Sequence, residues 1–134
     1  MKDSYRIGDT YTYTLHTDDT MSAAQFQESS PAVFATPFLV GAVEAAAARM
    51  MEPWLDPGEM SVGGHVELSH GKPTPLGWEV RTEAKLVEAK GRKFVFEVAC
   101  YDEAEKIGSA RHTRFVIDAE PFMAMVTAKA EKAG

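Results

Sequence analysis

The sequence predicts an α+β fold in which a curled, mostly antiparallel sheet wraps one long central helix. Two patterns in the 134 residues carry this prediction. Residues 34–55, FATPFLVGAVEAAAARMMEPWL, are small and apolar, which is typical of one helix lying against a core. From Met60 onward, apolar and polar residues instead alternate, as they do in half-buried strands. No repeat or low-complexity segment divides the chain, so we expect one domain over residues 1–134.

The N-terminal part is expected to form one strand, a connecting segment and the helix. In residues 5–17, YRIGDTYTYTLHT, hydroxylated residues alternate with aromatic or apolar ones, which predicts a strand. Residues 18–34 are irregular and polar, which indicates a loop or short helix of the length that often acts as a lid. Thr36 is a good N-cap, and Pro37 suits the first helical position. The helix is expected to end near Glu52, because a proline and the turn sequence LDPGE follow.

Four further strands are expected in hairpin-like succession. Their ranges are 60–70, 77–86, 94–101 and 109–118. In the first of them, strict alternation places one set of residues on a common face: Met60, Val62, Val66, Leu68 and His70. Residues 124–134 are expected to be a short frayed helix or a disordered end. One helix on a curled sheet of this kind is the hot-dog arrangement.

The predicted sheet also suggests how copies of the chain associate. One helix cannot cover both faces and both edges of five strands. Exposed sheet edges tend to pair with another chain unless they are protected. We therefore expect a homodimer that continues the sheet across an edge, and whether dimers join in a higher oligomer stays open.

The composition excludes several classes of protein. A formal net charge of −6 without any Lys/Arg cluster argues against a nucleic-acid partner. The first residues, MKDSYRIGD, lack the apolar run of a signal peptide, and no stretch reaches membrane-spanning length. We therefore expect a soluble cytoplasmic protein with no membrane partner. The single cysteine, Cys100, alternates with core positions and is expected to be a packed thiol. The four histidines are scattered without HxH or HExxH spacing, so no metal site and no cofactor are expected.

Glu44 is the most informative residue of the helix. It is the only ionisable side chain from residue 31 to residue 48, and its neighbours one turn away are small or apolar. A carboxylate on the solvent edge of the helix is an equally ordinary explanation. A helix with a wide solvent face usually carries several charges, however, so we expect Glu44 to point into a cleft. Desolvation there would suit it to work as a base or a nucleophile.

Two further polar residues accompany the helix. His70 ends the first strand after the helix, and a histidine that is simply hydrogen-bonded there is the more ordinary explanation. Thr36 lies eight residues before Glu44, about 80° around the helix, so the two could line adjacent walls of one cleft. The amides at the start of the helix also favour an anion or a developing oxyanion. His65 lies on the opposite face of the predicted strand from His70 and is expected on the surface.

Two features of the strands point to the same region. Gly63 and Gly64 interrupt a strand, which indicates a bulge or the close approach of a ligand. In RHTRFVI, alternation places His112 with Arg114 on one face and Arg111 with the intervening Thr on the other. One of these pairs is expected to be solvated, but alternation does not say which.

Several stretches together resemble the fluoroacetyl-CoA thioesterase-like family of hot-dog proteins. The central block is residues 33–77, VFATPFLVGAVEAAAARMMEPWLDPGEMSVGGHVELSHGKPTPLG. The opening MKDSYRIGDTYTYT and the later KIGSARHTRFVI extend the resemblance over nearly the whole chain. The combined pattern of a helix Thr and Glu, a strand Gly and His, and a late-strand Arg is fairly specific, whereas any single piece is weak.

The resemblance implies hydrolysis of an acyl-CoA thioester at a site on the dimer interface. The implied catalytic residues are Thr36, Glu44 and His70, and the implied substrate-binding residues are Gly63, Arg114 and Phe34. Glu44 would attack the thioester carbonyl or activate water. His70 would assist proton transfer or polarise the carbonyl, and Thr36 would orient the carboxylate or the water. The implied partner is a coenzyme A thioester, and no cofactor is implied.

The nature of the acyl group stays open. Residues 18–34 are shorter than the aromatic-rich lid of the fluoroacetate-specific member, and Pro37 stands where that family usually has glycine. The resemblance therefore implies a short or medium acyl-CoA, of which fluoroacetyl-CoA is one candidate. A non-catalytic protein that binds acyl-CoA or a small ligand is one alternative. A hot-dog hydratase or dehydratase is another, although the Asp/His pair usual in those enzymes is not found.

Overall fold

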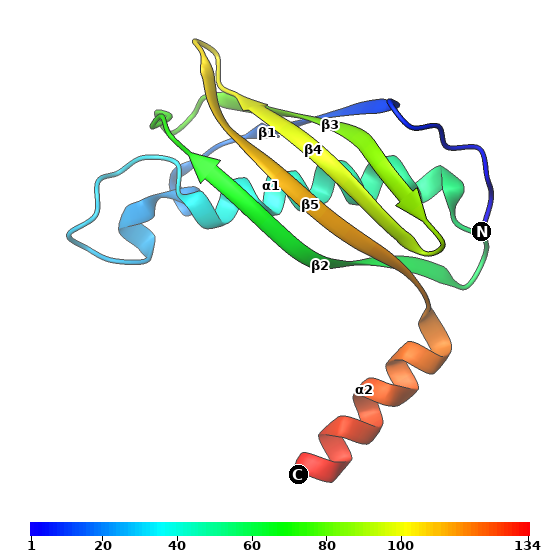
Figure 1. Ribbon diagram of the computed structural model, residues 1–134. Helices are drawn as coiled ribbons and strands as arrows, with labels where there is room; N and C mark the ends of the chain where they lie inside the picture. Colours follow the sequence, from blue (N-terminus) through cyan, green and yellow to red (C-terminus); the bar gives the residue numbers. More distant parts are fainter.

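The structure is a computed structural model that describes all of residues 1–134, and it confirms the predicted α+β hot-dog architecture (Figure 1). The strands are β1 (Thr10–His16), β2 (Glu59–His70), β3 (Glu79–Lys90), β4 (Lys93–Tyr101) and β5 (Lys106–Asp118). The helices are α1 (Thr36–Met51) and α2 (Ala119–Ala133). All pairings in the sheet are antiparallel, in the order β1-β3-β4-β5-β2.

The order of the strands departs from the predicted hairpin succession at one point. β3, β4 and β5 are neighbours as expected, but β2 pairs with β5 at the edge of the sheet. The connection over residues 71–78 contains two glycines and two prolines and is much longer than a tight hairpin loop. It carries the chain across the end of the sheet, so β2 and β1 form the two open edges.

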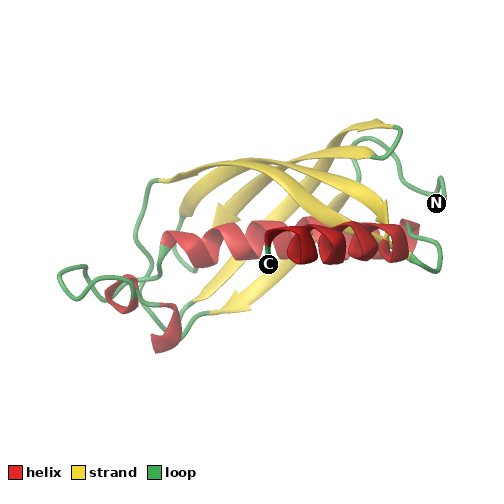
Figure 2. Cartoon of the chain, turned by 90° about the horizontal axis from the view of Figure 1, so that it is seen from below, coloured by secondary structure: helices red, strands yellow, loops and turns green.

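The core lies between α1 and the inner face of the sheet. Figure 2 shows α1 running along the curve of the strands. The buried residues of α1 recur every three or four positions, which forms the apolar stripe that a core-facing helix needs: Leu39, Ala42, Val43, Ala46, Ala47, Met50 and Met51. Every second residue of β3 from Val80 to Leu86 and of β4 from Phe94 to Cys100 is buried, as the alternation of polar and apolar residues predicts. Cys100 is a packed thiol as predicted, and burial raises its pKa to about 11.

β2 is the strand where simple alternation is wrong. Gly63 pairs with Arg114 and His65 with Thr113, so Gly64 is an extra residue in a β-bulge. The bulge shifts the alternation by one position, and the Met60 side of the strand turns outward, with Met60 56% exposed. Ser61 and Gly63, not Met60 and Val62, therefore share the inner face with Val66, Leu68 and His70. The glycine pair predicted this bulge, and the bulge exchanges the two faces of the strand for the residues before it.

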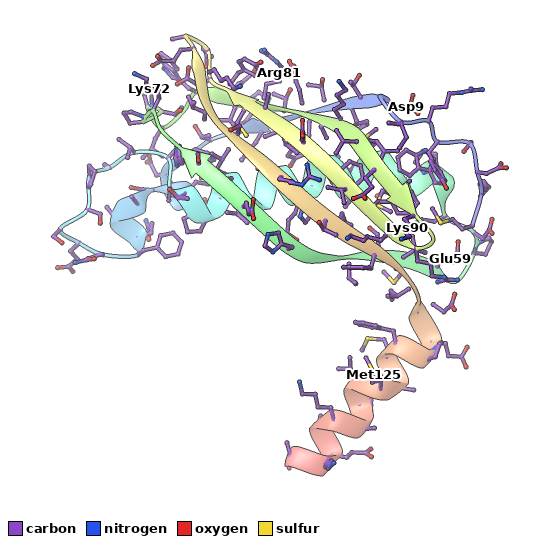
Figure 3. The ribbon with its side chains drawn as sticks, viewed as in Figure 1. Asp9, Glu59, Lys72, Arg81, Lys90 and Met125 are labelled. Atoms are coloured by element: carbon purple, nitrogen blue, oxygen red, sulfur yellow. The ribbon has the colours of Figure 1, made fainter.

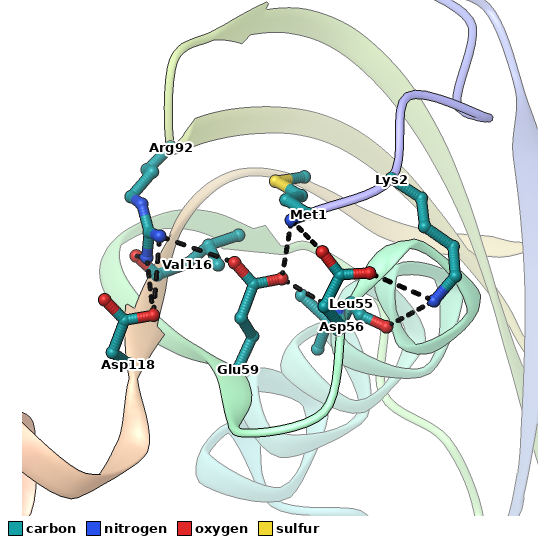
Figure 4. A network of polar contacts seen from close by, with 8 residues as sticks. All are labelled: Met1, Lys2, Leu55, Asp56, Glu59, Arg92, Val116 and Asp118. Atoms are coloured by element: carbon teal, nitrogen blue, oxygen red, sulfur yellow. Dashed lines mark hydrogen bonds and ion pairs between the residues drawn. The ribbon is translucent and has the colours of Figure 1, made fainter.

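The segments before α1 comprise the N-terminus, the strand β1 and two short 3-10 turns. Residues 18–34 form two 3-10 turns, Asp19–Met21 and Ala23–Gln25, in agreement with the expected loop or short helix. The first strand begins later than predicted, at Thr10, because a turn occupies the residues before it. At the other end of the molecule, the amino group of Met1 contacts Asp56 and Glu59 in the network drawn in Figure 4.

The C-terminal helix α2 is longer than the short helix or disordered end that we expected. Asp118 ends β5, and the next 15 residues are helical without burying a single residue. Figure 3 shows α2 leaving the body at the Glu59 end of β2, with Met125 far from the sheet and Lys72 beyond the opposite end of β2. Met123 and Met125 are 54% and 61% exposed. None of the helices has the length and apolarity that a membrane-spanning helix requires.

Candidate active site

Thr36 and His70 meet where the end of β2 passes the start of α1. The Thr36 Oγ1 atom lies 2.8 Å from His70 Nδ1, within hydrogen-bond distance. The prediction that Thr36 is the N-cap is wrong, because Ala35 occupies that position and no side chain caps the helix. Thr36 is the first helical residue, and Pro37 is therefore the second. The hydroxyl is thus free of the backbone and available to the imidazole.

The other nitrogen of His70 is the more informative atom. His70 Nε2 is buried and has no hydrogen-bond partner. Most buried polar atoms in proteins are hydrogen-bonded, so an unsatisfied ring nitrogen indicates a site for an absent group. Phe34, which is 1% exposed, packs edge-on against the imidazole with ring centroids 6.3 Å apart. Burial lowers the pKa of His70 and outweighs the opposing effect of the Lys72 backbone, which favours the neutral ring that a base or acceptor requires.

Glu44 lies in the middle of α1 and finds its partner on the sheet. Glu44 Oε2 is 3.5 Å from Nη1 of Arg114, which lies on β5. The predicted burial in a cleft is not met within one chain, because the Glu44 side chain is 43% exposed. The charge of Glu44 is therefore compensated by Arg114 on β5, which lies 70 residues away in the chain.

Arg114 is held by contacts on all sides. Its side chain is 8% exposed. The guanidinium donates through Nε to Ser61 Oγ at 3.1 Å and through Nη2 to the Ser61 backbone oxygen at 3.0 Å. Burial lowers the pKa of Arg114, and the charge of Glu44 opposes this effect. The open question about the two faces of β5 is thereby answered: His112 and Arg114 are buried, whereas Arg111 is exposed.

Gly63 lets the helix carboxylate approach the strand. A Cβ atom at Gly63 would lie 2.6 Å from Glu44 Oε2, closer than Cβ contacts in real proteins. It would also lie 3.2 Å from the His112 ring and 3.4 Å from Arg114 Nη1. The predicted close approach at this glycine therefore exists, and the approaching group is the chain's own Glu44.

Sequence reasoning missed two members of this cluster, Ser61 and His112. Strict alternation assigned Ser61 to the outer face, and only the bulge at Gly64 turns it inward. His112 carried a usable signal, since it shares a face with Arg114 in RHTRFVI. His65 is on the surface as predicted, with its side chain 58% exposed.

The two groups of residues are separated along α1. Thr36 with His70 lies at the start of the helix, and Glu44 with Arg114 and Gly63 lies at its middle. Eight residues of helix, at about 1.5 Å each, place Thr36 and Glu44 about 12 Å apart along the axis. A surface groove of about 690 Å³ lies on the outer face beside Glu67, Glu97 and Arg111, and Thr36, Glu44 and His70 are not among the residues that line it.

The chain is similar in sequence and in fold to known thioesterases. The family model described as "Fluoroacetyl-CoA-specific thioesterase" matches residues 17–120. The fluoroacetyl-CoA thioesterase of Streptantibioticus cattleyicolor is 36% identical over 135 residues, covering 96% of this chain and 97% of that protein. A crystal structure of a point mutant of the fluoroacetyl-CoA-specific thioesterase FlK superposes with a TM-score of 0.89 at 36% identity, covering 96% of this chain and 99% of that one. A complex of the same mutant with fluoroacetate and CoA gives 0.82 at 35% identity, covering 88% and 99%.

Proposed function

The chain belongs to the fluoroacetyl-CoA-specific thioesterase family and is an acyl-CoA thioester hydrolase, and from this premise we propose that Glu44, His70 and Thr36 carry the reaction. The proposed substrate is a short or medium acyl-CoA, which is cleaved by water to the free acid and coenzyme A. The observation that carries the assignment is the state of His70. One of its nitrogens is engaged by Thr36, and the other is buried without a partner.

The proposed chemistry divides between the two groups of residues. The Glu44 carboxylate either deprotonates the attacking water or attacks the thioester carbonyl itself. His70 Nε2 is available to hydrogen-bond the reacting groups, and Thr36 sets the orientation of the ring. The positive end of the helix dipole at the start of α1, beside Thr36, suits the oxyanion that develops on the carbonyl oxygen. The acyl thioester would pass close to the backbone of Gly63, with Arg114 beside it and Phe34 packed behind His70.

We further propose that one active site is built from two chains of a homodimer. About 12 Å of helix separates Thr36 from Glu44, too far for both to touch one carbonyl from the same chain. The strand β2 carries Gly63 of one group and His70 of the other, and its open edge can pair with a second copy. A second copy alongside β2 would also lie against α2, which projects past that edge and exposes Met123 and Met125 (Figure 1). Thr36 and His70 of one subunit would then face Glu44 of the other.

A complementation experiment tests the shared site. Glu44→Gln and His70→Ala are each expected to be impaired alone, and mixed dimers are made by refolding the two variants together. In a mixed dimer, a shared arrangement leaves one of the two sites with both native residues. Random mixing should then restore about a quarter of wild-type turnover, once the dimer is verified by light scattering. Mixed dimers without any recovery would show that each chain contains its own complete site.

The thioesterase proposal itself is tested by thiol release from a panel of acyl-CoAs: acetyl, fluoroacetyl, medium-chain, arylacetyl and hydroxyacyl. Wild type is expected to hydrolyse at least one of them. His70→Ala and Thr36→Val are expected to lower its kcat about tenfold or more, since each removes one member of the Thr36–His70 pair that would hydrogen-bond the reacting groups. His65→Ala is the matched control, because its ring is exposed and contacts only Glu67. A folded protein that cleaves no thioester but binds CoA esters would instead be the binding protein among the alternatives.

A further inference from the structure

His112 is the one titratable residue of the Glu44 cluster to which the proposed chemistry gives no task. It lies on β5 with its side chain fully buried, at 0% exposure. Its Nδ1 atom is 2.7 Å from the backbone oxygen of His65 on the neighbouring strand β2. A carbonyl oxygen can only accept a hydrogen bond, so Nδ1 must carry the proton and donate it. This contact fixes the tautomer and the plane of the ring.

The fixed tautomer determines what the other ring nitrogen does. With the proton on Nδ1, Nε2 presents a lone pair, and Arg114 Nη1 lies 3.2 Å from it. The same Nη1 carries a second hydrogen, and the acceptor on its other side is Glu44 Oε2 at 3.5 Å. Ser61 accepts from Nε of the guanidinium through its hydroxyl oxygen and from Nη2 through its backbone oxygen. A chain of contacts thus runs from the His65 carbonyl through His112 and Arg114 to Glu44.

We propose that His112 is a positioning residue for thioester hydrolysis, which holds the Arg114 guanidinium so that Glu44 is presented across Gly63. This inference rests on the proposed function, in which the Glu44 carboxylate carries the reaction. His112 does not touch the substrate, because it is buried and both of its nitrogens are engaged within the chain. It acts through Arg114 alone.

The role requires a neutral ring, and the surroundings of His112 favour one. Burial lowers its pKa, and the charge of Arg114 acts in the same direction, while the His65 carbonyl and Glu44 oppose them. A second proton would sit on Nε2, remove the acceptor and place two cations side by side. The charged and titratable groups that act on the ring electrostatically are Arg114 and Glu44, which lie beside it, and the exposed imidazole of His65. The neutral histidine is therefore both the acceptor for Nη1 and a spacer that adds no charge.

Two amide substitutions separate the two nitrogens of the ring. The amide of glutamine reaches about as far as Nε2, and that of asparagine about as far as Nδ1. His112→Gln therefore keeps an acceptor for Arg114, whereas His112→Asn keeps the donor to His65 and loses that acceptor. We expect His112→Gln to retain a third or more of wild-type kcat. We expect His112→Asn to lose about tenfold in kcat with KM within about twofold, because the change affects only how the carboxylate is presented.

A merely structural role would give a different pattern. Loss of packing would lower the melting temperature of both variants and reduce kcat in proportion to it, without distinguishing Gln from Asn. Equal turnover in the two variants, either high or low, would therefore overturn the proposal. Comparison is made at a temperature well below both melting transitions, with wild type and Glu44→Gln assayed alongside.

A second readout does not depend on turnover and separates this inference from the proposed function. In crystal structures of the two variants, His112→Gln should keep the Arg114–Glu44 contact near 3.5 Å, and His112→Asn should release it. An unchanged contact in His112→Asn would overturn the positioning role even in an active enzyme. If Glu44→Gln turns over substrate as fast as wild type, Glu44 is not catalytic and the proposed function fails. The crystal structures still report whether His112 holds Arg114.

Discussion

Replacing Glu44 with glutamine is expected to lower kcat for thioester hydrolysis by about 10³-fold, the usual scale for loss of a general base. Glutamine keeps the length of the side chain and an oxygen that can still accept from Arg114. It cannot take a proton from water and is a poor nucleophile. Substrate contacts and the helix are unchanged, so KM and the melting temperature should stay close to wild type. The measurement is steady-state thiol release on whichever acyl-CoA of the panel is turned over.

The matched control for this substitution is Glu67→Gln. Glu67 carries the same charge on β2, but its side chain is 70% exposed and contacts His65 outside the cluster. It should leave kcat within about twofold of wild type, since a substitution on the exposed surface has little effect on a buried cluster. A loss below about threefold in Glu44→Gln, under 1 kcal/mol of barrier, would contradict the role of Glu44 as the catalytic carboxylate.

The two ways in which Glu44 can act differ in what they leave on the enzyme. As a nucleophile, a Glu44 oxygen bonds to the acyl carbon while the coenzyme A thiolate leaves, and water then cleaves the mixed anhydride. As a base, Glu44 takes the proton of water, and no bond to the enzyme forms. Acid quenching of a single turnover followed by mass spectrometry of the Glu44 peptide distinguishes them. An added acyl mass indicates the nucleophile, and an unmodified peptide throughout the turnover indicates the base.

The sequence was sufficient for the parts of this fold that depend on local patterns. The period-two segments predicted the sheet, and the small apolar run predicted α1 together with the unusual position of Glu44. The alternation of RHTRFVI even paired His112 with Arg114. Which face of β5 was buried depended on the neighbouring strands, and that order is not encoded locally. The helix α2 was underestimated for a related reason, because it buries nothing within the chain and shows no clear core-facing pattern.

Thr36 illustrates how a correct local rule gives the wrong role. Threonine before a proline at a helix start is a strong N-cap signal. In the structure the end of β2 brings the His70 imidazole to the same hydroxyl, and the helix begins one residue earlier with Ala35 as its cap. Likewise, Glu44 lacked a partner only along its own helix. Its partner, Arg114, lies on β5, and the connection after β2 places β2 beside β5. Contacts between distant segments therefore decided the site, whereas local patterns decided the elements that carry it.

Gly63→Ala is expected to separate activity from stability. The added Cβ would fall 2.6 Å from Glu44 Oε2, and the carboxylate is the far end of a flexible, 43% exposed side chain. Glu44 can therefore swing toward solvent, whereas the buried His112 ring, 3.2 Å from the added Cβ, has to shift slightly and Arg114 loses its counter-charge, so the free energy of unfolding should fall by about 1–2 kcal/mol. The displaced carboxylate no longer meets Arg114 or the substrate. A misplacement of about 1 Å can cost about 10²-fold in rate, so we expect a loss of that order in kcat.

Gly64→Ala is the matched control for Gly63→Ala. It adds the same methyl group to the next residue of the same bulge, but its Cβ would meet the ring of Phe115 at 2.5 Å, on the outer face of the sheet. Phe115 is 38% exposed and can rotate away. Both substitutions should therefore cost similar stability in chemical denaturation, while only Gly63→Ala loses turnover. Equal turnover in the two variants would mean that the β2 backbone does not set the position of Glu44. A loss confined to Gly63→Ala would show that the absence of one methyl group from this strand allows the helix carboxylate to reach its catalytic position.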